Sequence, residues 1–461
     1  MHIHILGICG TFMGSVAQLA QQLGHRVTGC DAQVYPPMSQ QLQSAGIQLI
    51  EGYDPKQLSP APDLTLVGNA LSRGNPCVEY LLNHRLNYMS GPEWLGRTVL
   101  VDPHVFAVSG THGKTTTSSM LTAVLTGAGL RPGYLIGGVP LDSGVSASLG
   151  DGDFFVVEAD EYDSAFFDKR SKFLHYHSDT LLINNIEFDH SDIFADLAAI
   201  QRQFHHLIRT VPGRGAVIYP CGDEAIETVL NAGCWSDKLV YADADADADA
   251  DWRYRLLVPD GSDFEVLLSE CGSPLELGRV TWNLSGKHNV RNAMAAILAA
   301  YRVGIAVAQS CHILSGFAGV KRRMEVLYEN AGFTLYDDFA HHPTAIASTL
   351  EGLRAKVGDS TIVAVVEPRS ATMREGIHRH MLAQSVAHAD RVIWYQPADL
   401  VWDIEQVMAA TTVAWEIVDN IEFMIGRCAD LALPNTQMVI MSNGGFQGLA
   451  AKLLARLNVR S

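Results

Sequence analysis

Val108-Ser109-Gly110-Thr111-His112-Gly113-Lys114-Thr115-Thr116-Thr117 is the stretch that decides how this chain folds and what it binds. The apolar run before it, Val105–Val108, predicts a buried strand, and the segment after it, Ser118–Leu125, predicts a helix. A glycine turn between strand and helix directs backbone N–H groups and the helix dipole toward an anion. Lys114 can reach terminal phosphates, and the Thr115 hydroxyl can ligate Mg²⁺. We interpret the stretch as an ATP phosphate loop. The match is incomplete, because the full G-x-x-x-x-G-K pattern requires glycine at position 108 and this chain has Val108 there. The alternative is a glycine turn with a surface lysine.

Length, charge and cysteine content narrow the class of protein. Single cores stop growing at roughly 250–300 residues, so 461 residues predict two to four domains. The net charge of −17 argues against non-specific binding to nucleic acid or anionic membranes, which need positive potential. The eight cysteines show no C-x-x-C pair and no zinc spacing, which favours reduced thiols. No signal segment and no run of about 18 apolar residues occur, so we expect a cytoplasmic protein without stable membrane association.

The first segment, residues 1–98, opens as a nucleotide-binding βαβ unit. A strand (Ile3–Leu6), the turn Gly7–Gly14, a helix (Ser15–Leu23) and a second strand ending at Asp31 follow one another. The spacing G-x-x-G-x-x-x-G differs from the dinucleotide pattern G-x-G-x-x-G, and the alternative is that the glycines only allow close helix packing. Ligands of such sheets bind at the carboxyl ends of strands, so the strand Leu64–Ala70 adds three candidate contacts, Asn69, Ser72 and Arg73.

The second segment, residues 99–318, carries polar groups at the ends of two further apolar runs. Phe154–Glu158 delivers a carboxylate, and Leu181–His190 delivers acids and an imidazole. Beside a phosphate loop, Glu158 and His190 are candidate metal ligands. The Ala-Asp tract 242–251 lacks the turn glycine and spaced Glu of a calcium loop, so we expect a solvated, partly disordered surface loop without function.

A helical pattern begins at Gly286 near the end of the same segment. Within it His288, Asn289 and Asn292 share one face, because they are three and four residues apart. Such a face suits adenine, which needs a few oriented donors and acceptors. The alternative is that Asn289 caps the helix and its neighbours are solvated.

The third segment, residues 319–461, reads as another α/β sheet with a ligand edge. A basic cluster, Lys321–Arg323, precedes the strand Phe333–Tyr336, and Asp337–Thr344 with two histidines follows it. Glu367-Pro368-Arg369-Ser370 follows the strand Thr361–Val366. Arginines for carboxylates and histidines for proton transfer favour a peptide or amino-acid substrate. The predicted fold is therefore α/β with three domains: Rossmann-like, central P-loop ATPase, and Rossmann-like.

These segments in this order resemble the Mur ligase family, the ATP-dependent amide-forming enzymes of peptidoglycan synthesis. The matching motifs are the loop 110–117, Glu-Ala-Asp-Glu 158–161, Asn-Asn-Ile-Glu-Phe-Asp-His 184–190, Gly-Lys-His-Asn 286–289 and Asp-Asp-Phe-Ala-His-His-Pro-Thr 337–344. The resemblance covers the whole chain apart from the Ala-Asp tract.

Finer features are similar to the branch of the family that recycles peptidoglycan. They are Asp31–Ser39, Ser72–Glu79, Met89–Pro92, Glu367–Ser370 and Ser442–Phe446. This similarity implies that UDP-N-acetylmuramate and the murein tripeptide L-Ala-γ-D-Glu-meso-diaminopimelate are joined through an acyl phosphate. The alternative is free L-alanine as acceptor, as in the branch that usually has a Pro-His-Arg-Tyr-type sequence at Glu367–Ser370.

The resemblance also implies a role for each candidate residue. ATP would contact Gly110, Thr111, His112, Gly113, Lys114, Thr115, Thr116, His288, Asn289, Asn292, Arg323 and Asp338. UDP-N-acetylmuramate would contact Gly10, Thr11, Met13, Gly14, Asp31, Asn69, Ser72 and Arg73. Mg²⁺ would be held by Thr115 and Glu158, with His190 at a second metal. One departure is that no lysine occurs from Ser191 to Gly213, where several members carry a carbamoylated lysine.

Lys114, Glu158, His190, His341 and Arg369 are the expected catalytic residues. His341 would take the proton of the amine, with a hydrogen-bonded loop histidine as the alternative, and Arg369 would orient a peptide carboxylate. A nicotinamide-dependent oxidoreductase would leave the phosphate loop unexplained. A non-catalytic ATP switch would release no phosphate in response to an acceptor.

Overall fold

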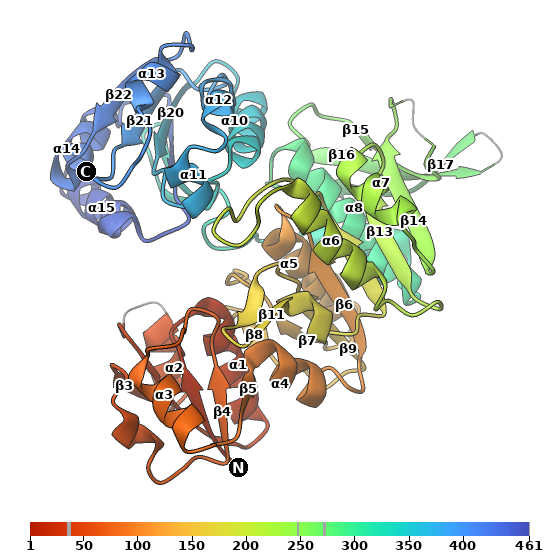
Figure 1. The fold of residues 1–461 in the computed structure, drawn as a ribbon. Helices are drawn as coiled ribbons and strands as arrows, with labels where there is room; N and C mark the ends of the chain where they lie inside the picture. The colour runs from red at the N-terminus through yellow and green to blue at the C-terminus, as the bar shows by residue number, and fades with distance from the viewer. Residues whose placement is uncertain (35–37, 247–248, 271–272, 461) are drawn as a thin grey trace.

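The computed structural model describes residues 1–34, 38–246, 249–270 and 273–460. Three helix-covered sheets follow one another along the chain, and their strands are predominantly parallel. The prediction of an α/β fold with three domains is confirmed. Figure 1 shows the first domain, in red and orange, and the third, in blue, as separate bodies that each adjoin the middle domain.

The first domain is built on a parallel sheet of order β3-β2-β1-β4-β5. Its strands are β1 (His2–Leu6), β2 (Arg26–Asp31), β3 (Gln48–Glu51), β4 (Leu64–Val67) and β5 (Tyr88–Ser90). Its helices are α1 (Thr11–Gln22), α2 (Met38–Ser44), the 3-10 helix η1 (Pro55–Leu58), α3 (Pro76–Asn83) and α4 (Gly91–Thr98). Side-chain oxygens of Asn75 and Ser90 cap α3 and α4.

The middle domain holds a ten-stranded sheet of order β17-β16-β15-β14-β13-β12-β6-β9-β7-β8. The strands from β15 to β7 in this order are parallel, and β16, β17 and β8 extend the sheet antiparallel. The core strands are β6 (His104–Ser109), β7 (Gly133–Leu135), β9 (Phe154–Glu158), β12 (Thr180–Ile183) and β13 (Ala216–Pro220). The outer strands are β8 (Ala147–Ser148), β14 (Asp237–Asp243), β15 (Trp252–Leu256), β16 (Asp263–Glu270) and β17 (Ser273–Thr281).

Helices α5 (Lys114–Gly127) and α8 (Lys287–Arg302) pack together against this sheet, because α8 carries buried alanines at 293, 295, 296, 299 and 300 that permit close approach. The other helices are α6 (Leu197–Ile208), α7 (Glu224–Asn231), α9 (Val307–Ser315) and η2 (Lys172–His175). A separate hairpin of β10 (Asp163–Ala165) and β11 (Asp168–Ser171) leads into η2.

The Ala-Asp tract connects β14 to β15. Its first two residues are not loop: Ala242 and Asp243 end β14 and pair with β15, so the prediction of a loop over the whole tract was wrong there. Ala242 is buried, and tertiary pairing outweighs the local charge pattern. Residues 247 and 248 lie outside the described part of the chain.

The third domain has a six-stranded sheet of order β18-β19-β23-β20-β21-β22, parallel except for β18. Its strands are β18 (Glu325–Asn330), β19 (Phe333–Asp338), β20 (Thr361–Val366), β21 (Arg391–Tyr395), β22 (Ala414–Val418) and β23 (Thr436–Met441). Its helices are α10 (Pro343–Val357), α11 (Ala371–Glu375), α12 (Arg379–Ser385), α13 (Ile404–Met408), α14 (Ile421–Asp430), η3 (Phe446–Gly448) and α15 (Leu449–Arg460).

The hydrophobic cores divide differently from the sheets. One cluster of buried side chains runs from β1 and α1 of the first domain into β6, β9 and α6 of the middle domain. The two clusters of the third domain contain no buried side chain from residues before Phe333. The first two domains therefore share a core, whereas the third segment contributes one buried side chain, Val320, to the described cluster of the middle domain. None of the described cysteines is in a disulfide, and no described helix is both long and apolar enough to cross a membrane.

Gly96 in α4 tests the contact between the first two domains. A Cβ at this position would overlap the backbone carbonyl oxygen of His175 in η2, which cannot swing away as a side chain can. We expect Gly96→Ala to lower the free energy of unfolding by about 1–3 kcal/mol in urea titrations. Gly426→Ala is the matched control, because a Cβ there meets only the Arg456 side chain at 4.0 Å. The control should be neutral or stabilising by up to about 1 kcal/mol. Equal effects of the two substitutions would contradict the conclusion that Gly96 makes a close contact between the first two domains.

His4 on β1 predicts an acid-sensitive first domain. Its ring is 1% exposed, Nδ1 lies 2.8 Å from the Thr28 hydroxyl, and burial lowers its pKa to about 4. The unfolded chain, with a pKa near 6.5, therefore binds the proton first, so stability is full above about pH 6.5 and falls as the pH approaches 4. This one group accounts for up to about 3 kcal/mol. Hydrogen exchange of β1 amides, measured at pH 7 and pH 5, should show this loss of stability. The loss should be smaller in His4→Gln and unchanged in the control His206→Gln, which replaces an exposed histidine. A His4→Gln protein with the full loss would reject the explanation.

Candidate active site at the junction of the three domains

A cavity of about 1040 Å³ lies where the three domains meet. Its walls come from the β6–α5 loop, the segments after β9 and β12, the start of α8 and the segment after β19. Thr11 and Phe12 of α1 complete it from the first domain. The cavity therefore brings together most of the sequence motifs predicted to carry chemistry.

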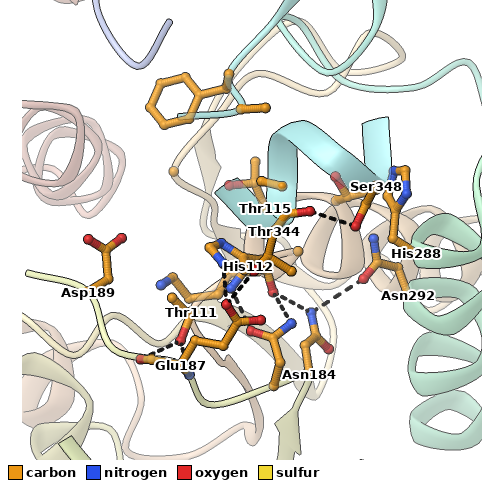
Figure 2. Close-up of a pocket in the computed structure, with 18 of the residues that line it drawn as sticks. Thr111, His112, Thr115, Asn184, Glu187, Asp189, His288, Asn292, Thr344 and Ser348 are labelled. Atoms are coloured by element: carbon orange, nitrogen blue, oxygen red, sulfur yellow. Dashed lines mark hydrogen bonds and ion pairs between the residues drawn. The ribbon is translucent and has the colours of Figure 1, made fainter. Parts of the chain in front are cut away.

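The β6–α5 loop is held in its shape by two asparagines. Gly110 and Gly113 have φ of +126° and +81°, which side-chain-bearing residues rarely adopt. A Cβ on Gly113 would lie 2.5 Å from Asn292 Oδ1 and 2.7 Å from Asn184 Nδ2. Figure 2 shows Asn184 hydrogen bonded toward the loop on one side and Asn292 on the other. The turn can thus take a bulky anion only on its open side, at the start of α5.

Lys114 is the first residue of α5, and its ammonium group is buried among acids. Nζ donates to the Gly110 carbonyl at 2.7 Å and to Glu161 Oε2 at 2.9 Å, and lies 3.9 Å from Asp160 Oδ1. Burial alone would lower the pKa of Lys114, but the charges of Glu161 and Asp160 outweigh it and raise the pKa. The cation is therefore permanent.

Thr115 and Glu158 lie side by side, although they come from different elements. Thr115 Oγ1 donates to Glu158 Oε1 at 3.2 Å, and the Gly137 N–H donates to Oε2 at 2.7 Å. Burial raises the pKa of Glu158. Arg323, from the third segment, donates to Thr115 Oγ1 at 3.1 Å and stacks on the Phe339 ring. A hydroxyl and a carboxylate are the hard oxygen ligands that Mg²⁺ prefers, so this pair fits that ion.

His190 belongs to a different cluster from Glu158. Its Nε2 lies 3.1 Å from Glu161 Oε1, and ligand atoms of Asp160, Glu161 and His190 lie within 4.8 Å of one another. Burial would lower the pKa of His190, but the hydrogen bond to Glu161 and the nearby carboxylates raise it. The cluster could hold a second cation. Asp160 and Glu161 belong to the Glu-Ala-Asp-Glu motif, but the sequence alone predicted no role for either residue.

The predicted adenine face forms, and its members line the cavity. His288 Nδ1 is buried and has no hydrogen-bond partner in the described structure, and burial lowers the pKa of His288 to about 4. Asn289 Nδ2 donates to the Ser285 carbonyl at 2.7 Å. Gly286, not Asn289, occupies the N-cap of α8, so the capping alternative is wrong. The unpartnered ring nitrogen is an available acceptor or donor for a heterocycle.

Asp338 and His341 stand on the segment after β19. The Asp338 carboxylate accepts from the N–H groups of Met324 and Ala340, both at 2.8 Å, and burial raises its pKa. His341 Nδ1 lies 2.9 Å from the Phe339 carbonyl, which can only accept, so Nδ1 carries the proton. Nε2 is then the unprotonated nitrogen, 3.9 Å from Asp189 Oδ2, and burial lowers the pKa of His341 to about 4.

The segment 187–191 joins the middle domain to the third domain through polar contacts. Thr344 donates to Glu187 Oε2 at 2.7 Å, His378 Nε2 lies 2.8 Å from the Phe188 carbonyl, and Thr372 donates to Asp189 Oδ1 at 2.6 Å. Asp189 Oδ1 also accepts from the His190 N–H at 2.8 Å, and His190 has a φ of +58°. The contact with Thr372, 183 residues away, has no signal in the sequence.

His112 of the phosphate loop faces the same joint. Its Nε2 lies 3.6 Å from Glu187 Oε2, and His342 Nδ1 lies 3.5 Å from the same oxygen. His342 also caps α10 by accepting from the Thr344 N–H at 3.3 Å. His112 of the phosphate loop and His342 at the N-cap of α10 thus face the same carboxylate.

The candidate UDP-sugar residues gather elsewhere, apart from Thr11. Gly10 and Asn69 follow β1 and β4, Asp31 is the last residue of β2, and all three share the carboxyl edge of that sheet. Asp31 Oδ2 accepts from the Cys9 N–H at 2.8 Å and fixes the glycine turn. The remaining members, which do not line the cavity, are Met13, Gly14, Ser72 and Arg73.

Two of these side chains have structural partners. Met13 is buried, and its side chain packs against Gly91. Arg73 is paired with Glu79, with its guanidinium donating at 2.9 and 3.1 Å. Arg369, the predicted peptide-binding arginine, is exposed beside Gly444 and lies outside the cavity wall, which includes its neighbours Ser370 and Thr372.

Lys172 is a cavity residue that sequence reasoning missed. It begins η2, is 7% exposed, and donates to Asp160 Oδ2 at 2.9 Å. No motif contains it, and only the fold brings it to the cavity.

Comparison with known proteins matches nearly the whole chain. Residues 2–101 match the family described as "Mur ligase family, catalytic domain", residues 108–300 "Mur ligase middle domain", and residues 322–444 "Mur ligase, glutamate ligase domain". An Escherichia coli protein named UDP-N-acetylmuramate–L-alanyl-gamma-D-glutamyl-meso-2,6-diaminoheptandioate ligase is 51% identical over 455 residues, 98% of each chain. A Syntrophomonas wolfei protein named UDP-N-acetylmuramate–L-alanine ligase is 30% identical over 391 residues, 85% of this chain and 81% of that one.

A solved structure agrees with these sequence matches. The murein peptide ligase of Psychrobacter arcticus superposes with a TM-score of 0.77 at 46% identity, covering 99% of this chain and 98% of that one. The phosphate loop, the acids that follow β9 and β12, and the three-domain cavity thus occur in a chain that matches all three family domains in order. This protein belongs to the Mur ligase family and is a ligase.

Proposed function

We propose that this ligase uses ATP to join the carboxyl group of UDP-N-acetylmuramate to the amine of L-Ala-γ-D-Glu-meso-diaminopimelate, a reaction of peptidoglycan recycling. The observation that carries the proposal is the cavity shared by three domains, with the glycine turn and Lys114 on one wall and His341 on another. The 51% identity to a ligase named for this tripeptide, against 30% to one named for alanine, supports the acceptor. We place the domain limits at 1–98, 99–318 and 319–461.

The phosphate loop would hold the triphosphate. The free N–H groups at the start of α5 would meet the phosphates, since the Thr111 and His112 N–H groups donate to Asn185, and Lys114 adds a positive charge. His288, Asn289 and Asn292 would contact adenine, and Asp338 and Arg323 would approach the ribose and phosphates from the third segment. Negative charge develops on the leaving phosphate oxygen in the transition state. Fixed cations that neutralise this charge are therefore the main source of rate acceleration in such a site.

Thr115 and Glu158 are the residues that would hold Mg²⁺, with His190 at a second cation. Thr115 Oγ1 and Glu158 Oε1 lie 3.2 Å apart, and the Glu161 and Asp160 carboxylates adjoin His190. Bound Mg²⁺ supplies neutralisation of phosphate charge and orientation of the transferred group.

The chemistry takes two steps. A carboxylate oxygen of the sugar acid attacks the γ-phosphorus of ATP, the bond to the ADP oxygen breaks, and an acyl phosphate forms. The peptide amine then attacks the acyl carbon, phosphate leaves, and the amine proton passes to a base. His341 Nε2 is the candidate base, because its other nitrogen is held by the Phe339 carbonyl and burial keeps the ring neutral at pH 7. Arg369 is the candidate for orienting a peptide carboxylate.

The acceptor assay tests the proposed function directly. Phosphate release with MgATP and UDP-N-acetylmuramate should rise with the tripeptide and not with L-alanine, and mass spectrometry should find UDP-muramoyl-tripeptide. The physical reason is that a site built for several carboxylates gains little from an acceptor with one. Stimulation by L-alanine would instead assign the reaction that uses free L-alanine as acceptor. A protein that neither acceptor stimulates would reject both assignments.

Variants of Lys114 and His341 should separate the two steps. Lys114→Met should lower acyl phosphate formation, measured by hydroxylamine capture, by at least about 100-fold, because it removes the cation at the phosphates. His341→Ala should leave hydroxylamine capture intact and lower amide formation by about 10²–10⁴-fold.

His380→Gln is the control for these variants, since His380 is an exposed histidine of α12. It should leave both rates unchanged. Equal loss of both steps in His341→Ala would mean that His341 is not the base for the amine.

A further inference from the structure

Lys172 has an ammonium group that the protein satisfies only in part. The residue is 7% exposed and lines the cavity. An ammonium has three N–H donors, and in the described structure this one has a single hydrogen-bond acceptor, Asp160 Oδ2 at 2.9 Å. Leaving buried donors without acceptors is costly. An anion in the cavity would supply the missing acceptors.

Two aromatic rings fix the position of this ammonium. Nζ lies 5.4 Å from the centre of the Phe12 ring and 5.5 Å from that of the Tyr162 ring. Phe12 belongs to α1 of the first domain, and Tyr162 follows the Glu-Ala-Asp-Glu motif of the middle domain. Ring faces attract a cation through their quadrupole but provide no lone pair. Lys172 is thus held at the seam between the domain that would bind the sugar nucleotide and the domain that would bind ATP.

Asp160 lies between this lysine and the phosphate loop. One of its oxygens accepts from Lys172, and the other lies 3.9 Å from Lys114 Nζ. The Asp160 carboxylate therefore separates the two ammonium groups. Lys114 lies at the phosphate loop, and Lys172 lies on the side of the first domain. Acyl phosphate formation requires two anions, a carboxylate and a phosphate, to approach each other against their repulsion. Two cations so placed reduce that repulsion.

We propose that Lys172 binds the carboxylate of the acid substrate and directs it toward the phosphate loop. This inference rests on the proposed function, since it names the residue that receives the carboxyl group in that reaction. The competing explanation is that Lys172 and Asp160 form an ion pair that only stabilises the seam. The two explanations differ in whether the effect of Lys172 depends on a carboxylate in the ligand.

Equilibrium binding of two sugar nucleotides to the intact protein separates these explanations. UDP-N-acetylmuramate carries the carboxylate, and UDP-N-acetylglucosamine lacks it. Wild type should bind the first about ten- to a hundredfold more tightly, as expected for a charge-assisted hydrogen bond. Lys172→Met keeps the apolar stem between Phe12 and Tyr162 but should bind both nucleotides with similar affinity. Lys172→Arg should restore part of the preference.

Lys169→Met is the matched control, since Lys169 is an exposed lysine three residues away on β11. It should keep the wild-type preference, and the affinity of Lys172→Met for a non-hydrolysable ATP analogue should stay within about twofold. A Lys172→Met protein that retains the full preference, or that loses affinity for both nucleotides equally, overturns the inference. A wild type that shows no preference for UDP-N-acetylmuramate instead overturns the proposed function.

Discussion

The absence of a side chain at Gly113 is the constraint on which the rest of the site depends. Asn184 and Asn292 stand against this glycine at distances that leave no room for a Cβ. Their positions bring the end of β12 and the start of α8 to the phosphate loop, so the acids after β12 and the adenine face come to the same cavity. The small residues of α8 then allow that helix to pack on α5. A local requirement for close approach thus sets the relative placement of three elements that are far apart in the sequence.

The domains are joined by two kinds of contact. A shared hydrophobic cluster unites the first domain with the middle domain, whereas polar contacts connect the middle domain to the third. Burial of apolar surface is non-directional and grows with area, whereas the joint to the third domain depends on a few directional hydrogen bonds, of which the one between Thr372 and Asp189 is buried. The first two domains are therefore held together mainly by buried area, and the third by the geometry of particular side chains.

The sequence predicted the sheets well because buried parallel strands are continuous apolar runs. The bounds of β9 and β20 match the predicted strands, and the glycine turns mark where β1 and β6 end. Lys114, Glu158 and His190 could be found because each follows such a run. Lys172 and Thr372 could not, since they reach the site only through tertiary packing. Ala242 shows the opposite error, because a charge pattern that predicts a loop was outweighed by pairing with β15.

The segment 187–191 serves two structures at once. Its Glu187 and Asp189 side chains accept from Thr344 and Thr372, its Phe188 carbonyl lies against His378, and its backbone carries His190 into the acidic cluster. Evolution cannot tune one of these tasks by changing this segment without disturbing the other. Second-site suppressors of a lesion here would therefore arise on the facing helices α10 to α12. Chimaeras that exchange the third domain between relatives would need to carry this segment with it.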